Sequence, residues 1–246
     1  MKKNLFVYLG TRNPDSRTYR YTTQIIDLFK KKANTDLGLD IEVAFYTPLN
    51  STLLPSTGCR NCFSYGKCSN EKNPDDQGDE IKKQLEKADI VLFASPVYSH
   101  NVSSDMKVLI DRLSYWGHIF KLVNKSAFVI TTSESNGSTF VADYLEKTFR
   151  FMGATIACTT NFINSEDFLA DDYIEETVEK LLFVCKPEYK FDSTNGQETT
   201  FQTLKLILKD YPENHFEYQY WKESGLFESD SLTDYMKLKL EQRTYG

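Results

Sequence analysis

One stretch of the sequence decides the fold: Ile90-Val91-Leu92-Phe93-Ala94-Ser95-Pro96. Its first five residues form a short, continuous apolar run, and the serine and proline that follow stop the run. Such a run is typical of a strand that is buried on both faces of a parallel sheet. We therefore predict a central strand here and look for similar runs on either side.

Four more runs of this kind occur, at residues 5–9, 41–45, 127–130 and 154–162. Between the runs, apolar residues recur at helical spacing, as in Tyr21, Ile25, Leu28 and Phe29. Alternation of buried strands with helices predicts an α/β protein with a parallel sheet and helices on both faces. Since no Gly-x-Gly-x-x-Gly follows the first strand, we predict a flavodoxin-like doubly wound five-stranded sheet with strand order 2-1-3-4-5.

Composition narrows the possible partners and the location. Lys plus Arg is 29 and Asp plus Glu is 35, a net charge of −6 over 246 residues, which argues against nucleic acid or an anionic membrane as a partner. No window approaches the roughly 18 consecutive apolar residues of a membrane span, and the N-terminal apolar run is too short for a signal peptide. The five cysteines are an odd number and predict free thiols in the cytoplasm.

The chain divides into two regions. Residues 1–185 hold the five strands and their helices, and residues 186–246 exceed what such a domain needs. We expect residues 186–200 to be a linker and the rest a helical, aromatic-rich extension, since 211–221 carries five aromatic residues in eleven. Packing of these rings on the domain or on a dimer partner is favoured; the alternative is that they roof a ligand site.

Ligands of doubly wound sheets bind beyond the carboxyl ends of the strands. The loop after the first strand offers three hydroxyls and a basic residue before a helix: Thr11, Ser16, Thr18 and Arg12. A helix N-terminus with such side chains is suited to a terminal phosphate, although a capped helix start beside a solvated loop is an equal alternative. No Walker pattern follows, which argues against phosphoryl transfer from a nucleotide.

The loops after the third and fourth strands complete the predicted site. The first of them suits a planar heteroaromatic ring, through Pro96, Val97, Tyr98, Asn101 and Val102. The second supplies further hydrogen-bond donors, with a glycine for close approach, in Thr132, Ser133 and Gly137.

These motifs resemble those of a known family. Ser95-Pro96-Val97-Tyr98, followed by Asn101-Val102-Ser103 and then Lys107, Ile110, Asp111 and Arg112, is similar to the flavin-binding signature of the flavodoxin-like NAD(P)H-dependent FMN reductases. Gly10-Thr11-Arg12 with Ser16 and Thr18 resembles the phosphate loop of the same family. The resemblance covers roughly residues 3–185. It implies bound FMN, NADPH or NADH as electron donor, and a homodimer with the flavin near the interface.

The resemblance assigns roles by position. It implies that Thr11, Ser16 and Thr18 hold the FMN phosphate near Arg12, that the residues from Pro96 to Val102 named above line the isoalloxazine ring, and that Thr132, Ser133 and Gly137 border its other edge. The chain departs from the family at 134–136, where glycines are common. No catalytic residue is required. Tyr98 and His100 are close enough on the motif to donate a proton, and plain packing or solvent exposure is the alternative, which we favour for His100.

The implied reaction passes a hydride from nicotinamide through flavin N5 to an organic acceptor. The acceptors of the broad family include quinones, nitro compounds and activated alkenes such as a dehydroamino acid in a modified peptide, so a small molecule or a peptide is expected. Two alternatives are a flavodoxin-like electron-transfer protein and a non-catalytic flavin sensor.

Three cysteines, Cys59, Cys62 and Cys68, lie in the long segment after the second strand. The iron–sulfur flavoproteins resemble this chain and place a closely spaced set of four cysteines there, of which this sequence lacks one. A cluster needs four thiolates, so we predict no metal site. Ordinary packing of the loop is favoured, and a redox-active pair of Cys59 with Cys62 is the lesser alternative.

Overall fold

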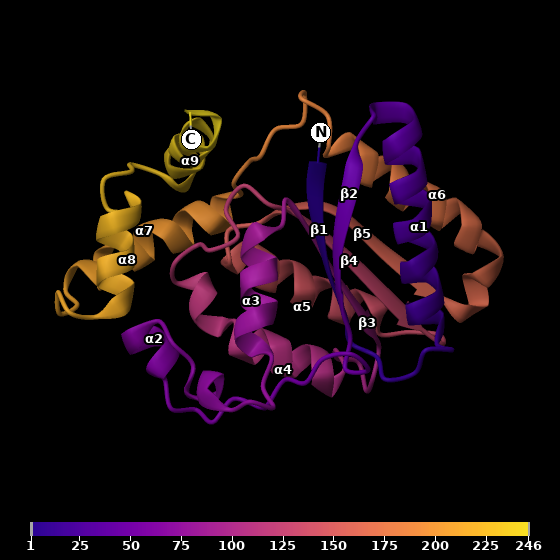
Figure 1. Cartoon of the computed structure of the whole chain (residues 1–246), viewed down its shortest axis with the longest axis horizontal. Coiled ribbons are helices and arrows are strands. Elements are labelled where there is room, and N and C mark those ends of the chain that lie inside the picture. The colour runs from indigo at the N-terminus through magenta and orange to yellow at the C-terminus, as the bar shows by residue number, and fades with distance from the viewer. Residues whose placement is uncertain (1, 246) are drawn as a thin grey trace.

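A computed structural model describes residues 2–245 of the chain, and the side chains of residues 2–242 (Figure 1). The strands are β1 (Lys2–Leu9), β2 (Asp40–Tyr46), β3 (Ile90–Pro96), β4 (Ser126–Ser133) and β5 (Thr155–Ile163). The α-helices are α1 (Arg17–Leu37), α2 (Asn61–Tyr65), α3 (Gly78–Lys87), α4 (Ser104–Arg112), α5 (Ser138–Phe151), α6 (Ala170–Phe183), α7 (Asn195–Lys209), α8 (Phe216–Ser224) and α9 (Leu232–Tyr245). Short 3-10 helices are η1 (Ser69–Lys72), η2 (Ser114–Gly117) and η3 (Asn164–Leu169). Across the described residues, no helix is long and apolar enough to cross a membrane.

The five strands form one parallel sheet in the order β2-β1-β3-β4-β5, which confirms the predicted fold class. Neighbouring side chains of each strand point to opposite faces. Phe6 and Phe93 belong to the hydrophobic core on one face, whereas Leu5 and Leu92 belong to the core on the other. Because both faces are covered, the central strands β1 and β3 are apolar at consecutive positions, from Leu5 to Leu9 and from Ile90 to Ala94.

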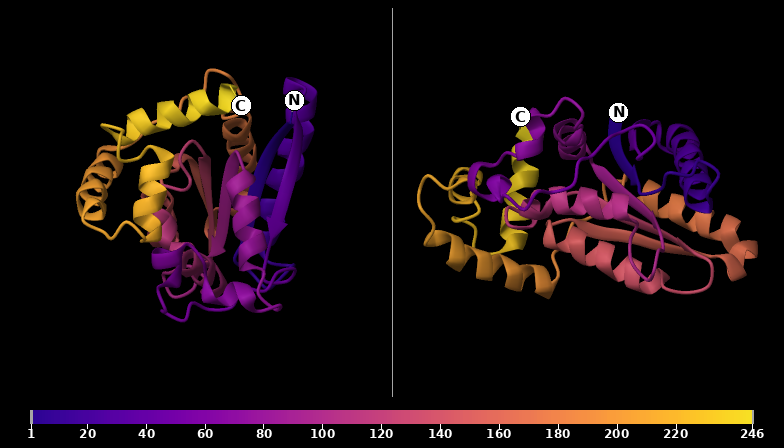
Figure 2. Two further views of the ribbon diagram at one scale, coloured as in Figure 1. Left: turned by 60° about the vertical axis from the view of Figure 1, so that its left-hand side comes forward. Right: turned by 90° about the horizontal axis from the view of Figure 1, so that it is seen from below.

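Helices cover the two faces unequally. The face of Leu5 and Leu92 is covered by α1 and α6. The face of Phe6 and Phe93 is covered by α3, α4 and α5, and its core also includes residues of α7, α8 and α9 (Figure 1). The three C-terminal helices lie on the side of the molecule away from α1 in every view (Figure 2).

Trp221 of α8 is the centre of the contact between the C-terminal helices and the sheet domain. It is fully buried, its indole Nε1 donates to the carbonyl of His118 at 2.7 Å, and its ring stacks on Phe201 at 5.4 Å between centroids. Phe120 completes the group at 6.1 Å from Trp221. Burial of an indole removes more apolar surface from water than any other single side chain can, so this contact stabilises the junction.

The predicted linker 186–200 is wrong at its C-terminal end. Helix α7 begins at Asn195, with Thr194 as its N-cap, and the side chains of Thr194 and Gln197 form a capping box. Gln197 also donates to the carbonyl of Ala154 at 3.1 Å, which ties the helix start to the sheet domain. Likewise α6 ends at Phe183, so Cys185 lies beyond the helix in which it was predicted.

The segment from Thr47 to Gln77 is an ordered covering rather than a free loop. It contains α2 and η1 and is fastened to α4 by an ion pair between Asp76 and Arg112, whose side chains are almost completely buried. Arg112 donates to both carboxylate oxygens at 2.6 and 2.8 Å and to the carbonyl of Leu54 at 2.8 Å. The pair therefore closes both ends of the cysteine-bearing segment onto the domain.

Candidate functional site

The loop between β1 and α1 presents backbone donors at the carboxyl edge of the sheet. Ser16 is the N-cap of α1 and its Oγ accepts from the backbone N–H of Tyr19 at 3.2 Å. The Thr11 hydroxyl lies 3.4 Å from the Ser16 hydroxyl. Because the first turn of a helix has no internal acceptors, the N–H groups of Arg17 and Thr18 are left for an anion.

The Thr18 hydroxyl, predicted to hold the phosphate, already has a partner within the protein. The residue is buried, and its Oγ1 shares a hydrogen bond with Oγ1 of Thr132, at the end of β4. The hydroxyl therefore joins the first loop to the third, and the backbone N–H of Thr18 is the group that remains for a phosphate.

The two arginines of the first loop point in different directions. Arg12 is largely exposed and is held by both carboxylate oxygens of Asp105, at 2.8 and 3.0 Å. Arg17 is mostly buried and its Nη2 donates to the Ser133 carbonyl at 2.8 Å and to Glu134 at 2.7 Å. Its Nη1 is buried without a hydrogen-bond partner in the described part of the chain.

Arg17, the second basic residue of the first loop, was not assigned to the phosphate from the sequence and is a further candidate for the site. It is the first residue of the helix, directly after the N-cap, so its charge lies close to any anion bound at the helix N-terminus. Arg12, predicted near the phosphate, is committed to Asp105 in the first turn of α4 instead.

The loop after β3 is a tight two-residue turn. Tyr98 and Asn101 exchange two backbone hydrogen bonds, at 2.9 and 3.0 Å, and the residues between them, Ser99 and His100, have φ of 50° and 61°. Residues other than glycine rarely adopt this left-handed backbone conformation. Where they do, the surrounding structure enforces it, and such positions cluster at functional sites. The turn leaves the Tyr98 ring 58 % exposed.

Buried contacts fix the base of this turn. The backbone N–H of Val97 donates to the carbonyl of Thr132 at 2.9 Å, and the Ser95 hydroxyl accepts from the N–H of Ser103 at 3.0 Å. Val102 is buried, and its N–H donates to the Asn101 side chain at 2.8 Å. The turn is therefore held at both ends while its tip stays open.

Gly137 brings the third loop against the second. Its φ is 85°, and a Cβ at this position would lie 2.8 Å from Val97 Cγ1 and 3.0 Å from His100 Nδ1. The neighbouring Ser133 hydroxyl is paired with Ser138 at 2.7 Å. The three loops therefore meet at one edge, and the predicted residues lie on them.

Exposed aromatic rings surround this edge. Phe140, in the first turn of α5, is 63 % exposed and lies edge-on to His100 at 5.7 Å between ring centroids. Together with Tyr98 it gives the open side of the site an apolar surface.

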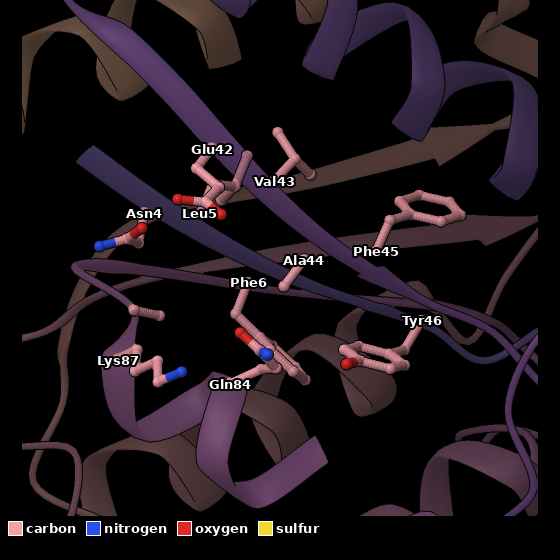
Figure 3. Close-up of a pocket in the computed structure, with 11 residues that line it drawn as sticks. Asn4, Leu5, Phe6, Glu42, Val43, Ala44, Phe45, Tyr46, Gln84 and Lys87 are labelled. Atoms are coloured by element: carbon pink, nitrogen blue, oxygen red, sulfur yellow. The ribbon is translucent and has the colours of Figure 1, made fainter. Parts of the chain in front are cut away.

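A separate cavity of about 400 Å³ lies on the sheet face between β2 and α3 (Figure 3). Its lining includes Phe6, Glu42, Tyr46 and Lys87, and none of the predicted site residues. Lys87 ends helix α3, and the C-terminal end of a helix disfavours an anion. This cavity is therefore a feature separate from the three loops.

Comparisons with known proteins agree with this geometry. The family model described as NADPH-dependent FMN reductase matches residues 4–167. An iron–sulfur flavoprotein of Archaeoglobus fulgidus is 25 % identical over 217 residues, which are 85 % of this chain and 94 % of the relative. An iron–sulfur flavoprotein of Clostridioides difficile is 26 % identical over 182 residues, covering 69 % of this chain and 77 % of that protein.

Solved structures share the fold. An azoreductase from Bacillus anthracis aligns with a TM-score of 0.57 at 16 % identity, covering 74 % of this chain and 98 % of the other. RosB, crystallised with a formylated riboflavin phosphate intermediate, aligns with a TM-score of 0.55 at 16 % identity, over 93 % of this chain and 88 % of its own. At these identities the likeness concerns the fold alone.

Proposed function

Because the chain belongs to the NADPH-dependent FMN reductase family, we propose that its three carboxyl-edge loops hold FMN and present it to a planar organic acceptor. The family makes the protein a flavin oxidoreductase that uses FMN with NAD(P)H as electron donor. Our proposal concerns three further properties: the residues that hold the flavin, the class of the acceptor and the oligomeric state.

The observation that carries the proposal is the pair of backbone N–H groups without an internal acceptor at the start of α1. These N–H groups, of Arg17 and Thr18, lie beside the Ser16 and Thr11 hydroxyls, and the Arg17 side chain reaches from there to the third loop. Among the described residues, the Nη1 of Arg17 is buried without a hydrogen bond and has the Asp167 carboxylate at 3.8 Å, so a bound phosphate would give it a closer partner. The residues therefore suit the phosphate of FMN.

The second and third loops suit the ring. Gly137 keeps the space beside Val97 and His100 free of a side chain, and the strained turn at Ser99 leaves backbone groups near the surface. FMN held by these loops would supply hydride transfer between NAD(P)H and the acceptor. The protein orients the ring, and Tyr98 supplies an exposed hydroxyl close to it, for which we propose a role in proton delivery.

The exposed rings of Tyr98 and Phe140 favour a planar aromatic acceptor. Flat aromatic surfaces bind other flat rings by stacking, each pair contributing about 0.5–1.5 kcal/mol beyond the area buried. We therefore propose a quinone or nitroaromatic compound ahead of an activated alkene such as a dehydroamino acid in a peptide.

We further propose a cytoplasmic homodimer. The apolar edge formed by Phe140 and Tyr98 would be covered by a second copy, which would also shelter the flavin. All five cysteines are free thiols in the structure, and free thiols are typical of a reducing compartment.

The test is an anaerobic visible spectrum of the FMN-loaded protein, before and after NADPH, followed by addition of one acceptor at a time. Bleaching by NADPH and rapid recovery with a quinone or nitroaromatic compound would support the proposal. Recovery only with a dehydroalanine peptide would overturn the acceptor class, and failure to bind FMN would overturn the site.

A further inference from the structure

Three thiols gather in the segment that covers α3 and α4. Cys59 is exposed, and its Sγ lies 3.3 Å from the Ser69 hydroxyl. Cys62, in α2, is half-buried against the core, and Cys68 is the N-cap of η1. The reductase site described above uses none of them.

An iron–sulfur cluster does not fit these residues, although relatives of the chain are named iron–sulfur flavoproteins. A [4Fe–4S] cluster takes four thiolates, and the segment supplies three. The other two, Cys158 and Cys185, pack against the hydrophobic core on the opposite face of the sheet. Among the described residues, no group of three or more His, Cys, Asp or Glu side chains is arranged to hold a metal ion.

The surroundings of Cys59 stabilise its thiolate. Hydrogen bonds from the Ser69 and Thr57 hydroxyls and from the backbone N–H of Asn61 lower the pKa of the Cys59 thiol to about 7. A thiolate that is also exposed is the form that attacks disulfides and electrophiles.

Cys62 is placed to act second. Burial, and then the neighbouring sulfurs of Cys68 and Cys59, raise the pKa of the Cys62 thiol, so Cys62 lies within electrostatic range of both other sulfurs. Cys68 is engaged elsewhere, since it caps η1 and interacts with the buried guanidinium of Arg112. Cys59 and Cys62 are three residues apart, the spacing of dithiol motifs that exchange disulfides.

We propose that Cys59 and Cys62 form a thiol–disulfide exchange site for low-molecular-weight disulfides. The Cys59 thiolate attacks one sulfur of the disulfide, which forms a mixed disulfide and releases one thiolate. Cys62 then loses its proton and attacks Cys59 Sγ, which closes the Cys59–Cys62 disulfide and releases the second thiolate. The protein dithiol loses two electrons, the small disulfide gains them and leaves as two thiolates, and the two thiol protons pass to the solvent.

Acidity alone gives Cys59 a modest advantage. At pH 7 a thiol of pKa about 7 is roughly fifty times more ionised than one at 9, but its intrinsic nucleophilicity is about tenfold lower, so the net gain is roughly fivefold. Exposure should add to the reactivity of Cys59 relative to Cys158 and Cys185, because these two thiols are half-buried and burial raises the pKa of each.

The test treats the full chain with the aromatic disulfide 5,5′-dithiobis(2-nitrobenzoate), whose released thiolate is coloured, and weighs the acid-quenched protein. The wild type is expected to release two equivalents of thiolate in the fast phase and to lose two hydrogens in mass, without a retained adduct. Cys62→Ser is expected to release one equivalent and to keep the adduct on Cys59. Cys59→Ser is expected to slow the fast phase at least about fivefold.

Cys68→Ser is the matched control and is expected to behave as the wild type. A stable adduct on wild-type Cys59 would overturn the proposal, because it would make Cys59 an isolated reactive thiol. An adduct retained by Cys68→Ser and lost by Cys62→Ser would also overturn it, because Cys68 would then be the partner. The readout needs no flavin, so its failure is distinct from failure of the reductase proposal.

Discussion

Two regions of the molecule are ordered by different forces. At the carboxyl edge of the sheet, small hydroxyls and backbone groups hold three loops together, as in the Thr18–Thr132 contact and the Val97–Thr132 hydrogen bond. In a second region, large rings and a buried ion pair hold the structure together: Trp221 lies at the centre of the junction with the C-terminal helices, and Arg112 fastens the segment from Thr47 to Gln77 to α4.

The difference teaches that binding and stability depend on separate residues. Short polar contacts position loops accurately but bury little apolar surface, whereas a buried indole and its neighbours account for several kcal/mol. Changes at the junction should therefore unfold the protein without altering the site, and changes at the edge should alter the site without unfolding the protein.

The largest expected effect is that of Trp221→Ala. It removes a fully buried indole that stacks on Phe201, and should lower the free energy of unfolding by about 4 kcal/mol. Urea denaturation followed by circular dichroism measures this free energy. Trp221→Phe is the control and should cost less, because it keeps an aromatic ring at this position. A decrease in the free energy of unfolding of under about 1 kcal/mol would contradict the stabilising role of this junction. A changed FMN affinity of the folded variant would contradict the separation of stability from binding.

Arg112→Met should cost about 3 kcal/mol, because it leaves the Asp76 carboxylate buried without its partner. The double variant Arg112→Met/Asp76→Leu should recover much of the loss, since no buried charge remains. If the double variant were no more stable than Arg112→Met, the cost would lie in packing and not in the unpaired charge.

The same ion pair predicts a pH dependence. Burial raises the pKa of Asp76, but hydrogen bonds from Arg112 and from the backbone of Leu54 and Gly78 outweigh burial and leave the pKa below its ordinary value. The stabilisation is therefore present above the ordinary carboxyl pKa and is lost as the pH falls through the lower folded value. Thermal melts from pH 6 downwards should show a steeper acid loss in the wild type than in Asp76→Asn.

At the edge, Ser16→Glu should weaken FMN binding roughly 100-fold, because its carboxylate competes with the phosphate for the start of α1. Helix stability should fall by no more than about 1 kcal/mol, because the favourable negative charge at the helix N-terminus partly offsets the loss of the Ser16 N-cap hydrogen bond. Fluorescence titration of FMN measures the affinity, with Thr199→Glu on the exposed face of α7 as a control of equal charge. Equal affinities in the two variants would remove the phosphate assignment.

Gly137→Ala has the smallest expected effect, about 1–2 kcal/mol in stability, because its φ of 85° disfavours a side chain and its Cβ would press on Val97. We expect FMN affinity to fall about tenfold with it. Gly38→Ala is the control, because Gly38 also has a left-handed backbone but has open space around it. This variant should lose stability through backbone strain alone and keep its FMN affinity.

Continuous apolar runs predicted the parallel sheet because burial on both faces leaves a strong local pattern, and the absence of Gly-x-Gly-x-x-Gly after the first strand predicted its order. Long-range polar contacts leave no local pattern in the sequence. Arg112 and Asp76 are 36 residues apart, and neither residue looks unusual by itself.

The sequence could not show which of Arg12 and Arg17 lies closer to a bound phosphate, because the direction of α1 decides which side chain points inward. The turn at Ser99 and His100 was hidden because neither residue is the glycine or asparagine that normally marks it. The start of α7 could have been found from the capping pattern of Thr194 and Gln197.

The most direct test of the central claim is hydrogen–deuterium exchange of the full chain with and without FMN. The three-loop site predicts slower exchange on FMN addition within 10–18, 95–104 and 131–138, and unchanged exchange in the cysteine segment 54–77 and in α8. Protection confined to the cysteine segment or to α8, or no protection at any loop, would contradict it.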